Sequence, residues 1–65
     1  MRNILVLNCA SRRGKKFGDE NSAKQYADEK VALWGHGQIN IIAFVDERSL
    51  AHWVEDRLED GWIIS

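Results

Sequence analysis

The sequence predicts a small α/β domain in which a three-stranded, mostly parallel sheet packs with two helices, in the order β-α-β-α-β. Apolar runs typical of strands occupy residues 3–9, 38–45 and 62–64, whereas residues 22–34 and 46–60 repeat their apolar residues at helical spacing. Because the connections between these segments are short, right-handed crossovers and parallel strand pairing are favoured.

The whole chain, residues 1–65, is expected to form a single domain. A chain this short buries only about 60% of the surface that its unfolded form exposes, so its core is marginal. The 45% of hydrophobic residues is nevertheless typical of a globular protein. One cysteine cannot form an internal disulfide, and one cysteine with two scattered histidines has no metal-ligand spacing. A homodimer or another partner is the remaining source of extra stability.

The first strand, "NILVLNC" at residues 3–9, is a continuous apolar run, which predicts a central strand covered on both faces. A spatial strand order of 2-1-3 would place the helices on opposite faces and explain this run. An order of 1-2-3 would place both helices on one face and leave the other face free to dimerise.

The first helix is expected to begin at a capping box formed by Ser22 and Gln25 and to end at Gly35 or Gly37. Ala23, Ala27, Val31 and Trp34 share one face of this helix. The alternative is an α+β fold in which residues 29–45 form a hairpin that turns at Gly35, His36 and Gly37.

The second helix is expected to be capped by Asp46 and to end at Gly61. Its buried stripe would contain Leu50, Trp53, Val54 and Leu58. Arg57 lies within this apolar arc, so its side chain should either extend outward to water or pair with a carboxylate, and we favour the first. Trp53 and Trp62 are both expected in the core.

Charge is unevenly distributed along the chain. Residues 1–18 carry five cations and no acid, whereas residues 19–65 carry four cations and ten acids. Four of the cations cluster in the expected loop over residues 10–21, namely Arg12, Arg13, Lys15 and Lys16. This basic loop could be a solvated surface, a contact to nucleic-acid phosphates, or half of a protein interface.

In the predicted topology the basic loop joins the C-terminal end of the first strand to the N-terminus of the first helix, where open α/β sheets bind anions. The start of the chain resembles the strand, phosphate loop and first helix of flavodoxin-like FMN reductases, with Cys9-Ala10-Ser11-Arg12 where that family has Gly-Ser-x-Arg. The resemblance implies a phosphate-binding loop, and it covers only the first third of the chain. Since the rest of that larger domain is missing, no flavin or other cofactor is expected.

The second helix carries an acidic outer face. Its carboxylates are stacked at i and i+4 near the helix C-terminus, where like charges and the helix dipole both disfavour them: Glu55, Asp56, Glu59 and Asp60. This pattern indicates a surface for a basic partner, or high charge for solubility alone. Trp34, at the end of the first helix, is the tryptophan expected to be exposed for binding.

No catalytic constellation is apparent, so an enzyme is not expected. Cys9 is interpreted as a small core residue, His52 as a solvated pair with Asp56, and His36 as a turn residue.

The sequence therefore favours a small non-enzymatic interaction protein, a regulator or inhibitor of the kind that phages and mobile elements encode. It would bind a protein partner through the acidic helix and the basic loop. The alternative is a nucleic-acid-binding module that contacts phosphates through Arg12–Lys16. No apolar stretch approaches the length of a membrane span or a secretory signal, so a cytoplasmic protein without membrane contact is expected.

Overall fold

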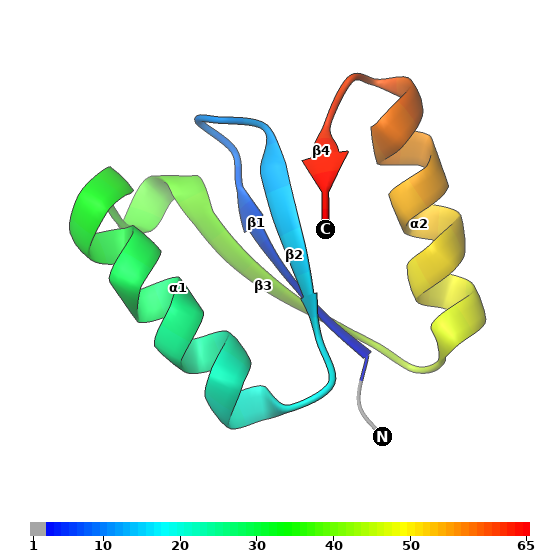
Figure 1. Cartoon of the computed structure of the whole chain (residues 1–65), viewed down its shortest axis with the longest axis horizontal. Coiled ribbons are helices and arrows are strands. Elements are labelled where there is room, and N and C mark those ends of the chain that lie inside the picture. The colour runs from blue at the N-terminus through cyan, green and yellow to red at the C-terminus, as the bar shows by residue number, and fades with distance from the viewer. Residues whose placement is uncertain (1–2) are drawn as a thin grey trace.

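The computed structural model describes residues 3–65 and has an α+β fold (Figure 1). In chain order its elements are β1 (Asn3–Asn8), β2 (Arg13–Phe17), α1 (Glu20–Trp34), the single 3₁₀ turn η1 (His36–Gln38), β3 (Ile39–Phe44), α2 (Glu47–Glu59) and β4 (Ile63–Ile64). The strands form one mixed sheet in the order β3-β1-β2-β4.

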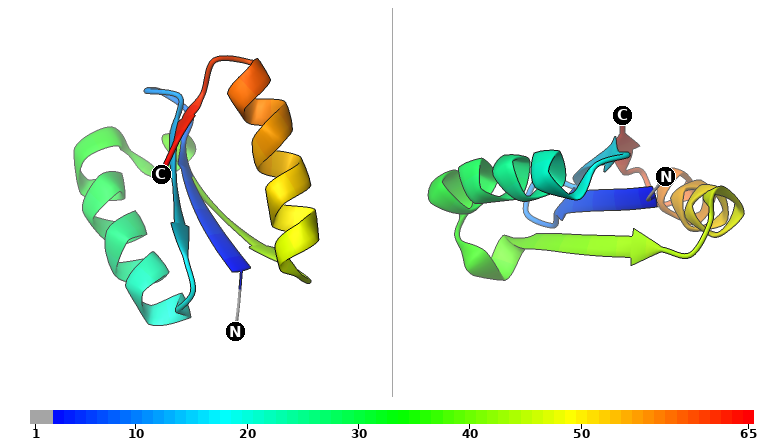
Figure 2. Two further views of the ribbon diagram at one scale, coloured as in Figure 1. Left: turned by 45° about the vertical axis from the view of Figure 1, so that its right-hand side comes forward. Right: turned by 90° about the horizontal axis from the view of Figure 1, so that it is seen from below.

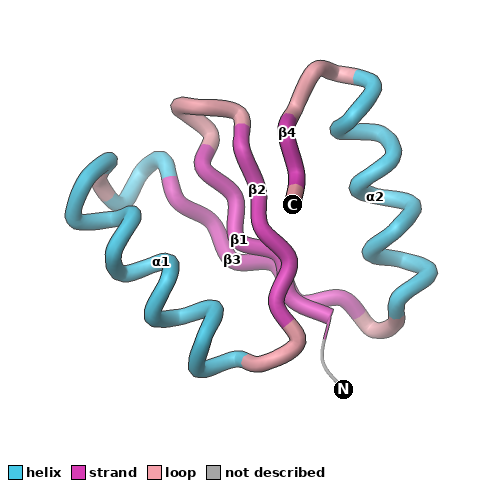
Figure 3. Tube along the Cα trace, in the orientation of Figure 1, coloured by secondary structure: helices cyan, strands magenta, loops and turns pink. Residues whose placement is uncertain are grey.

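The sheet forms a middle layer with α1 on one side and α2 on the other (Figure 3). β1 is antiparallel to both of its neighbours, β2 and β3, whereas β2 and β4 pair in parallel. Three strands therefore run in one direction and β1 alone runs in the other.

The predicted three-stranded, mostly parallel sheet is wrong in two respects. Residues 13–17, expected within the basic loop, form β2 and reverse the chain before α1 begins. Because of this reversal, β1 and β3 pair antiparallel and not parallel. Of the two helix placements left open by the sequence, the structure has the one with the helices on opposite faces of the sheet.

β1 is the centre of the core. Leu5 is 0% exposed and Val6 is 1% exposed, although the two side chains point to opposite faces of the sheet. Under α1 the buried residues are Ile4, Val6, Ala23, Ala27 and Ile39. Under α2 they are Leu5, Leu7, Leu50 and Val54. The prediction of a strand covered on both faces is confirmed.

α1 begins two residues earlier than the predicted segment because Asp19 caps it. The Asp19 carboxylate accepts hydrogen bonds from the Ser22 backbone N–H at 2.9 Å and the Ser22 hydroxyl at 2.8 Å. Ser22 is thus a donor in the first turn, and the predicted capping box is wrong. The helix ends at Gly35, which has a φ of 90°. Since residues 20–34 are helical, the alternative hairpin over residues 29–45 is also wrong.

α2 begins and ends as predicted. Asp46 accepts a hydrogen bond from the Ser49 N–H at 2.8 Å. At the other end Gly61 has a φ of 91°, and the Trp62 N–H donates to the Arg57 carbonyl at 3.0 Å, which is a Schellman motif. Leu58, expected in the buried stripe, is 50% exposed. Trp62 and Ile64 complete this side of the core in its place.

The two helix caps predict how stability depends on pH. Backbone N–H groups donate to the cap carboxylates, chiefly from Ser22 to Asp19 and from Ser49 to Asp46, and lower the pKa of each below its ordinary value of 3.8. A lowered pKa in the folded state stabilises the fold above the ordinary pKa, and this stabilisation is lost as the pH falls through the folded-state value.

Replacing both caps, by Asp19→Asn and Asp46→Asn, should keep the hydrogen-bond acceptors but remove this titration. Urea unfolding at pH 7 and at about pH 2.5 should then show a smaller acid-induced loss of unfolding free energy in the variant than in the wild type. An Asp19→Ala, Asp46→Ala variant should be less stable at both values. Equal acid sensitivity in the wild type and the Asn variant would contradict the assignment of the caps.

Gly14 predicts a second stability effect. A Cβ atom at this position would lie 3.0 Å from Leu7 Cδ2 and 3.3 Å from Ile64 Cγ1, in the core beneath α2. Gly14→Ala should therefore lower the unfolding free energy by about 1 kcal/mol. Gly37→Ala is the matched control, because a Cβ there meets no atom within 4 Å. It should change stability by less than about 0.5 kcal/mol. Equal effects of the two substitutions in chemical denaturation would show that Gly14 is not closely packed.

Candidate interaction surfaces

The cations of the predicted basic loop do not form one patch. Arg13 is opposite Asn8 and Lys15 is opposite Val6, so both lie on the α1 face of the sheet. Lys16 is opposite Leu5 and lies on the α2 face. Arg12 belongs to the turn between β1 and β2, where it has a left-handed φ of 56°. The alternation of side chains along β2 therefore divides the four charges among three surfaces.

The turn itself is organised by Asn8, a buried residue at the end of β1. Its side-chain oxygen accepts hydrogen bonds from the Ala10 N–H at 3.0 Å and the Ser11 N–H at 3.2 Å. An asparagine that bonds to the backbone two residues on is a turn signal. It is the one feature of the sequence that could have indicated a hairpin at this point.

The hairpin also removes the expected anion site. The β1–β2 turn lies at one end of the molecule and the N-terminus of α1 at the other, because β2 runs back between them (Figure 1). The expectation that residues 10–21 lead directly from the first strand into a helix N-terminus is therefore wrong. The phosphate loop implied by the resemblance to FMN reductases has no counterpart in this geometry.

A second group of residues joins the two cations on the α1 face. Lys15 Nζ lies 5.3 Å from the centre of the Tyr26 ring and 5.7 Å from that of Phe17. Lys30 Nζ lies 5.2 Å from the Tyr26 ring, so two ammonium groups share one aromatic ring. We call Arg13, Lys15, Phe17, Tyr26 and Lys30 the basic aromatic cluster. The sequence did not indicate it, because Tyr26 and Lys30 are remote from β2 along the chain.

The acidic residues of α2 are exposed, as expected for Glu55, Asp56, Glu59 and Asp60. Arg57 of the same helix is partly buried, and its guanidinium is 4.4 Å from the centre of the Trp53 ring. Its Nη1 atom also lies 3.6 Å from the Asp60 carboxylate. Arg57 thus extends over an aromatic ring and also pairs with a carboxylate.

The remaining charges of this acidic surface are mostly uncompensated. His52 Nδ1 lies 3.8 Å from the Glu55 carboxylate, so the predicted pairing of His52 with Asp56 is wrong. Within residues 3–65, neither Asp56 nor Glu59 forms an ion pair. The acidic surface therefore keeps a negative charge that is available to a partner.

Several of the predicted residues lie toward one end of the fold, which we call the turn end. It consists of the β1–β2 turn (residues 9–12), the C-terminal end of α1 with η1 (residues 33–38), and the C-terminal end of α2 (residues 59–61). In Figure 1 these segments lie toward the top, with the C-terminal end of α1 on the left, that of α2 on the right and the strands between them, and Figure 2 shows the same separation from another side. Arg12, Trp34, Glu59 and Asp60 all belong to this end.

The tryptophans and the cysteine differ in how well they were predicted. Trp34 is 48% exposed, as expected, and the neighbouring Leu33 is 74% exposed. Trp53 and Trp62 are partly buried and pack against the core under α2, so the prediction that both side chains point toward the core is confirmed. Cys9 is exposed, and its assignment to the core is wrong because β1 ends at Asn8. The Cys9 sulfur accepts a hydrogen bond from Asn40 Nδ2 at 3.4 Å.

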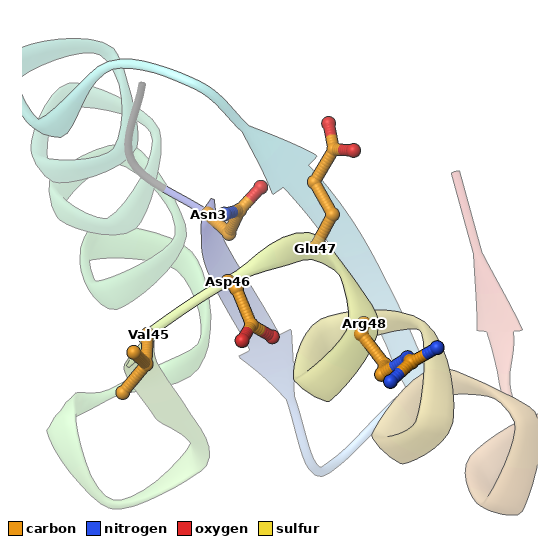
Figure 4. A pocket seen from close by; sticks show the side chains of 5 residues that line it. All are labelled: Asn3, Val45, Asp46, Glu47 and Arg48. Carbon is orange, nitrogen blue, oxygen red and sulfur yellow. The ribbon is translucent and has the colours of Figure 1, made fainter.

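The hollows of the surface do not converge on a ligand site. One lies at the start of α2, where the side chains of Asn3, Val45, Asp46, Glu47 and Arg48 point in different directions (Figure 4). A groove beside α2 is lined by Lys16 together with Leu50 and Val54. Within residues 3–65, no three metal-binding side chains come together. No helix in the same range has the length and apolar character needed to cross a membrane.

Comparison of the chain with protein-family models, with curated proteins and with solved structures finds no match. Its function has to be inferred from the surfaces described above.

Proposed function

We propose that the protein is a small non-enzymatic interaction module that binds a protein partner through the turn end and the acidic surface of α2. It would act as a regulator or inhibitor of the kind encoded by phages and mobile elements. The observation that carries this proposal is the exposed pair Leu33 and Trp34 at the turn end, where Arg12 and the carboxylates of Glu59 and Asp60 also lie.

An exposed tryptophan with a neighbouring leucine is a costly surface for a protein with so small a core. Tryptophan is enriched at the energetic centres of protein interfaces, where it is surrounded by a polar rim. At the same end of the fold Arg12 adds a positive charge, and Glu59 and Asp60 add negative charge on the other side of the sheet. The unpaired carboxylates of Asp56 and Glu59 belong to the acidic surface of α2 and favour a basic partner there.

The proposed lack of catalysis is supported by the separation of the reactive side chains. Cys9 and His36 belong to the turn end, but the cysteine is hydrogen-bonded to Asn40 and not to a histidine. His52 lies on the exposed side of α2 beside Glu55. A nucleophile, a base and an orienting group would have to be in hydrogen-bond reach of one another.

Site-specific photocrosslinking tests the protein-binding surface. The substitution Trp34→p-benzoylphenylalanine should capture a defined protein from a lysate, whereas Gln25→p-benzoylphenylalanine, exposed on α1, should not. With the captured protein purified, Trp34→Ala should weaken binding by roughly 30-fold, the loss expected of an interface hot spot.

Changing Glu55, Asp56, Glu59 and Asp60 to Lys should abolish binding of the same protein. Equal capture from positions 34 and 25, or undiminished binding by the Lys variant, would contradict the proposed surface.

A second candidate is nucleic-acid binding, which the basic aromatic cluster favours. Three cations, Arg13, Lys15 and Lys30, lie on the α1 side, two of them over the Tyr26 ring. Single-stranded nucleic acids bind to surfaces of this kind, where cations contact phosphates and aromatic rings stack on bases. The acidic remainder of the chain would repel a polyanion elsewhere.

Salt titration separates the two candidates. If the cluster binds phosphates, replacing Arg13, Lys15 and Lys30 by Ala should weaken DNA or RNA binding and reduce the slope of log affinity against log salt by about three. Lys16→Ala, on the other face of the sheet, is the matched control and should change neither quantity. For a protein-binding module we expect nucleic-acid binding no tighter than roughly micromolar at physiological salt. Tight, salt-sensitive binding by the wild type would favour the second candidate.

A further inference from the structure

β3 forms one edge of the sheet, and its outer side is open. Among residues 3–65 it pairs only with β1. In the view from below in Figure 2, β3 lies at the margin of the molecule, outside both helices. Exposure agrees with this position, since Ile41 is 47% exposed.

The backbone groups that face outward can be assigned from the hydrogen bonds of the whole sheet. The N–H groups of Lys16 and Ser65 donate to the carbonyls of Ser65 and Gly14, so even-numbered residues of β2 face β4. The odd-numbered residues of β2 therefore direct their backbone groups toward β1, where they pair with even-numbered residues. The odd-numbered residues of β1 then bond to β3, where their partners are even-numbered. The Cys9 N–H donates to the Gln38 carbonyl at 2.8 Å, which agrees with bonding between odd-numbered residues of β1 and even-numbered residues of β3. Ile39, Ile41 and Ala43 consequently direct their N–H and C=O groups away from the sheet.

The composition of this edge is unusual for one left open. Edge strands are usually protected by charged side chains, proline, bulges or a covering segment. The segment from Ile39 through Val45 contains no charged residue and no proline, and it continues into Val45, which is 96% exposed. Such an edge is a template for another strand.

We propose that β3 pairs with β3 of a second copy of this chain, antiparallel and about a two-fold axis through Ile41. This inference concerns a different surface from the turn end and does not depend on the function proposed for it. In this register Ile41 faces its own copy, and Ile39 of each chain faces Ala43 of the other. Each of these three pairs consists of outward-facing residues, so the joint would contain about six backbone hydrogen bonds.

Two physical arguments favour a second copy as the occupant. The strand meets an identical strand without any like-charge contact, because it carries no charge at all. A two-fold axis normal to the sheet keeps the residues of each face together, so the large Ile39 packs beside the small Ala43. The joint is made by one six-residue strand from each chain, so the interface is small. We therefore expect a dimer in the micromolar range or weaker.

Sedimentation velocity from about 10 μM to about 1 mM, around the weak affinity expected of so small an interface, tests the proposal. The wild-type chain should shift from monomer to dimer across this range. Ile41→Lys should remain monomeric, whereas Leu58→Lys, which changes an equally exposed residue on α2, should dimerise like the wild type. Trp34→Ala should also dimerise normally. This control shows that dimerisation through β3 does not depend on the surface proposed to bind a protein partner. A monomeric wild type at the highest concentration, or unchanged association of Ile41→Lys, would overturn the proposal.

Amide hydrogen exchange on the wild type gives a second test that does not depend on whether Ile41→Lys folds. The amides of Ile39, Ile41 and Ala43 should exchange more slowly as the protein concentration rises. Protection that is independent of concentration would overturn the proposal, as would protection that appears only when an unrelated extended peptide is added. In the latter case the occupant of the edge is a strand of another protein.

Discussion

The burial of β1 between two helices is the constraint on which the rest of the fold depends. Its successive side chains enter two separate cores, and Leu5 and Val6 are almost completely buried on opposite faces. Each core is small, so each needs a helix, and a helix on each face requires the chain to cross the sheet twice. The crossovers from β2 to β3 and from β3 to β4 move in opposite directions across the sheet, and right-handed connections then place α1 and α2 on opposite sides.

The helices and β1 were predictable because their signals are local. Apolar spacing, the cap at Asp46 and the glycines at 35 and 61 all act within one or two turns of chain. β2 was not predictable in the same way, because Arg13–Phe17 has the composition of a solvated loop. These residues form a strand because β1 and β4 supply hydrogen-bonding partners on both sides. Tertiary pairing here overrides local propensity. Because β2 was not predicted, the predicted direction of β3 relative to β1 was also wrong.

The candidate surfaces also differ in whether local sequence or tertiary structure determines them. The exposure of Trp34 and the acidic face of α2 follow from position on a single helix, and both were predicted. The basic segment was treated as a unit because its cations are adjacent in sequence. Pleating separates Lys15 from Lys16, and it brings Lys15 to Tyr26 and, through that ring, to Lys30. Which charges share a surface is decided by strand register, and register depends on the buried pattern of β1.

The two-residue strand β4 has a consequence for the order in which the fold is assembled. Residues 3–44 contain β1, β2, α1 and β3, and these elements complete the core beneath α1 without any later part of the chain. The remaining third, α2 and β4, is joined to β2 by backbone hydrogen bonds of Arg12–Lys16, and it packs on one face of the sheet through Leu50, Val54 and the partly buried Trp53, Trp62 and Ile64. Since synthesis proceeds from the N-terminus, a three-stranded, single-helix unit can form while the last third is still emerging. The C-terminal third then docks onto a face already built, where it covers Leu5 and Leu7.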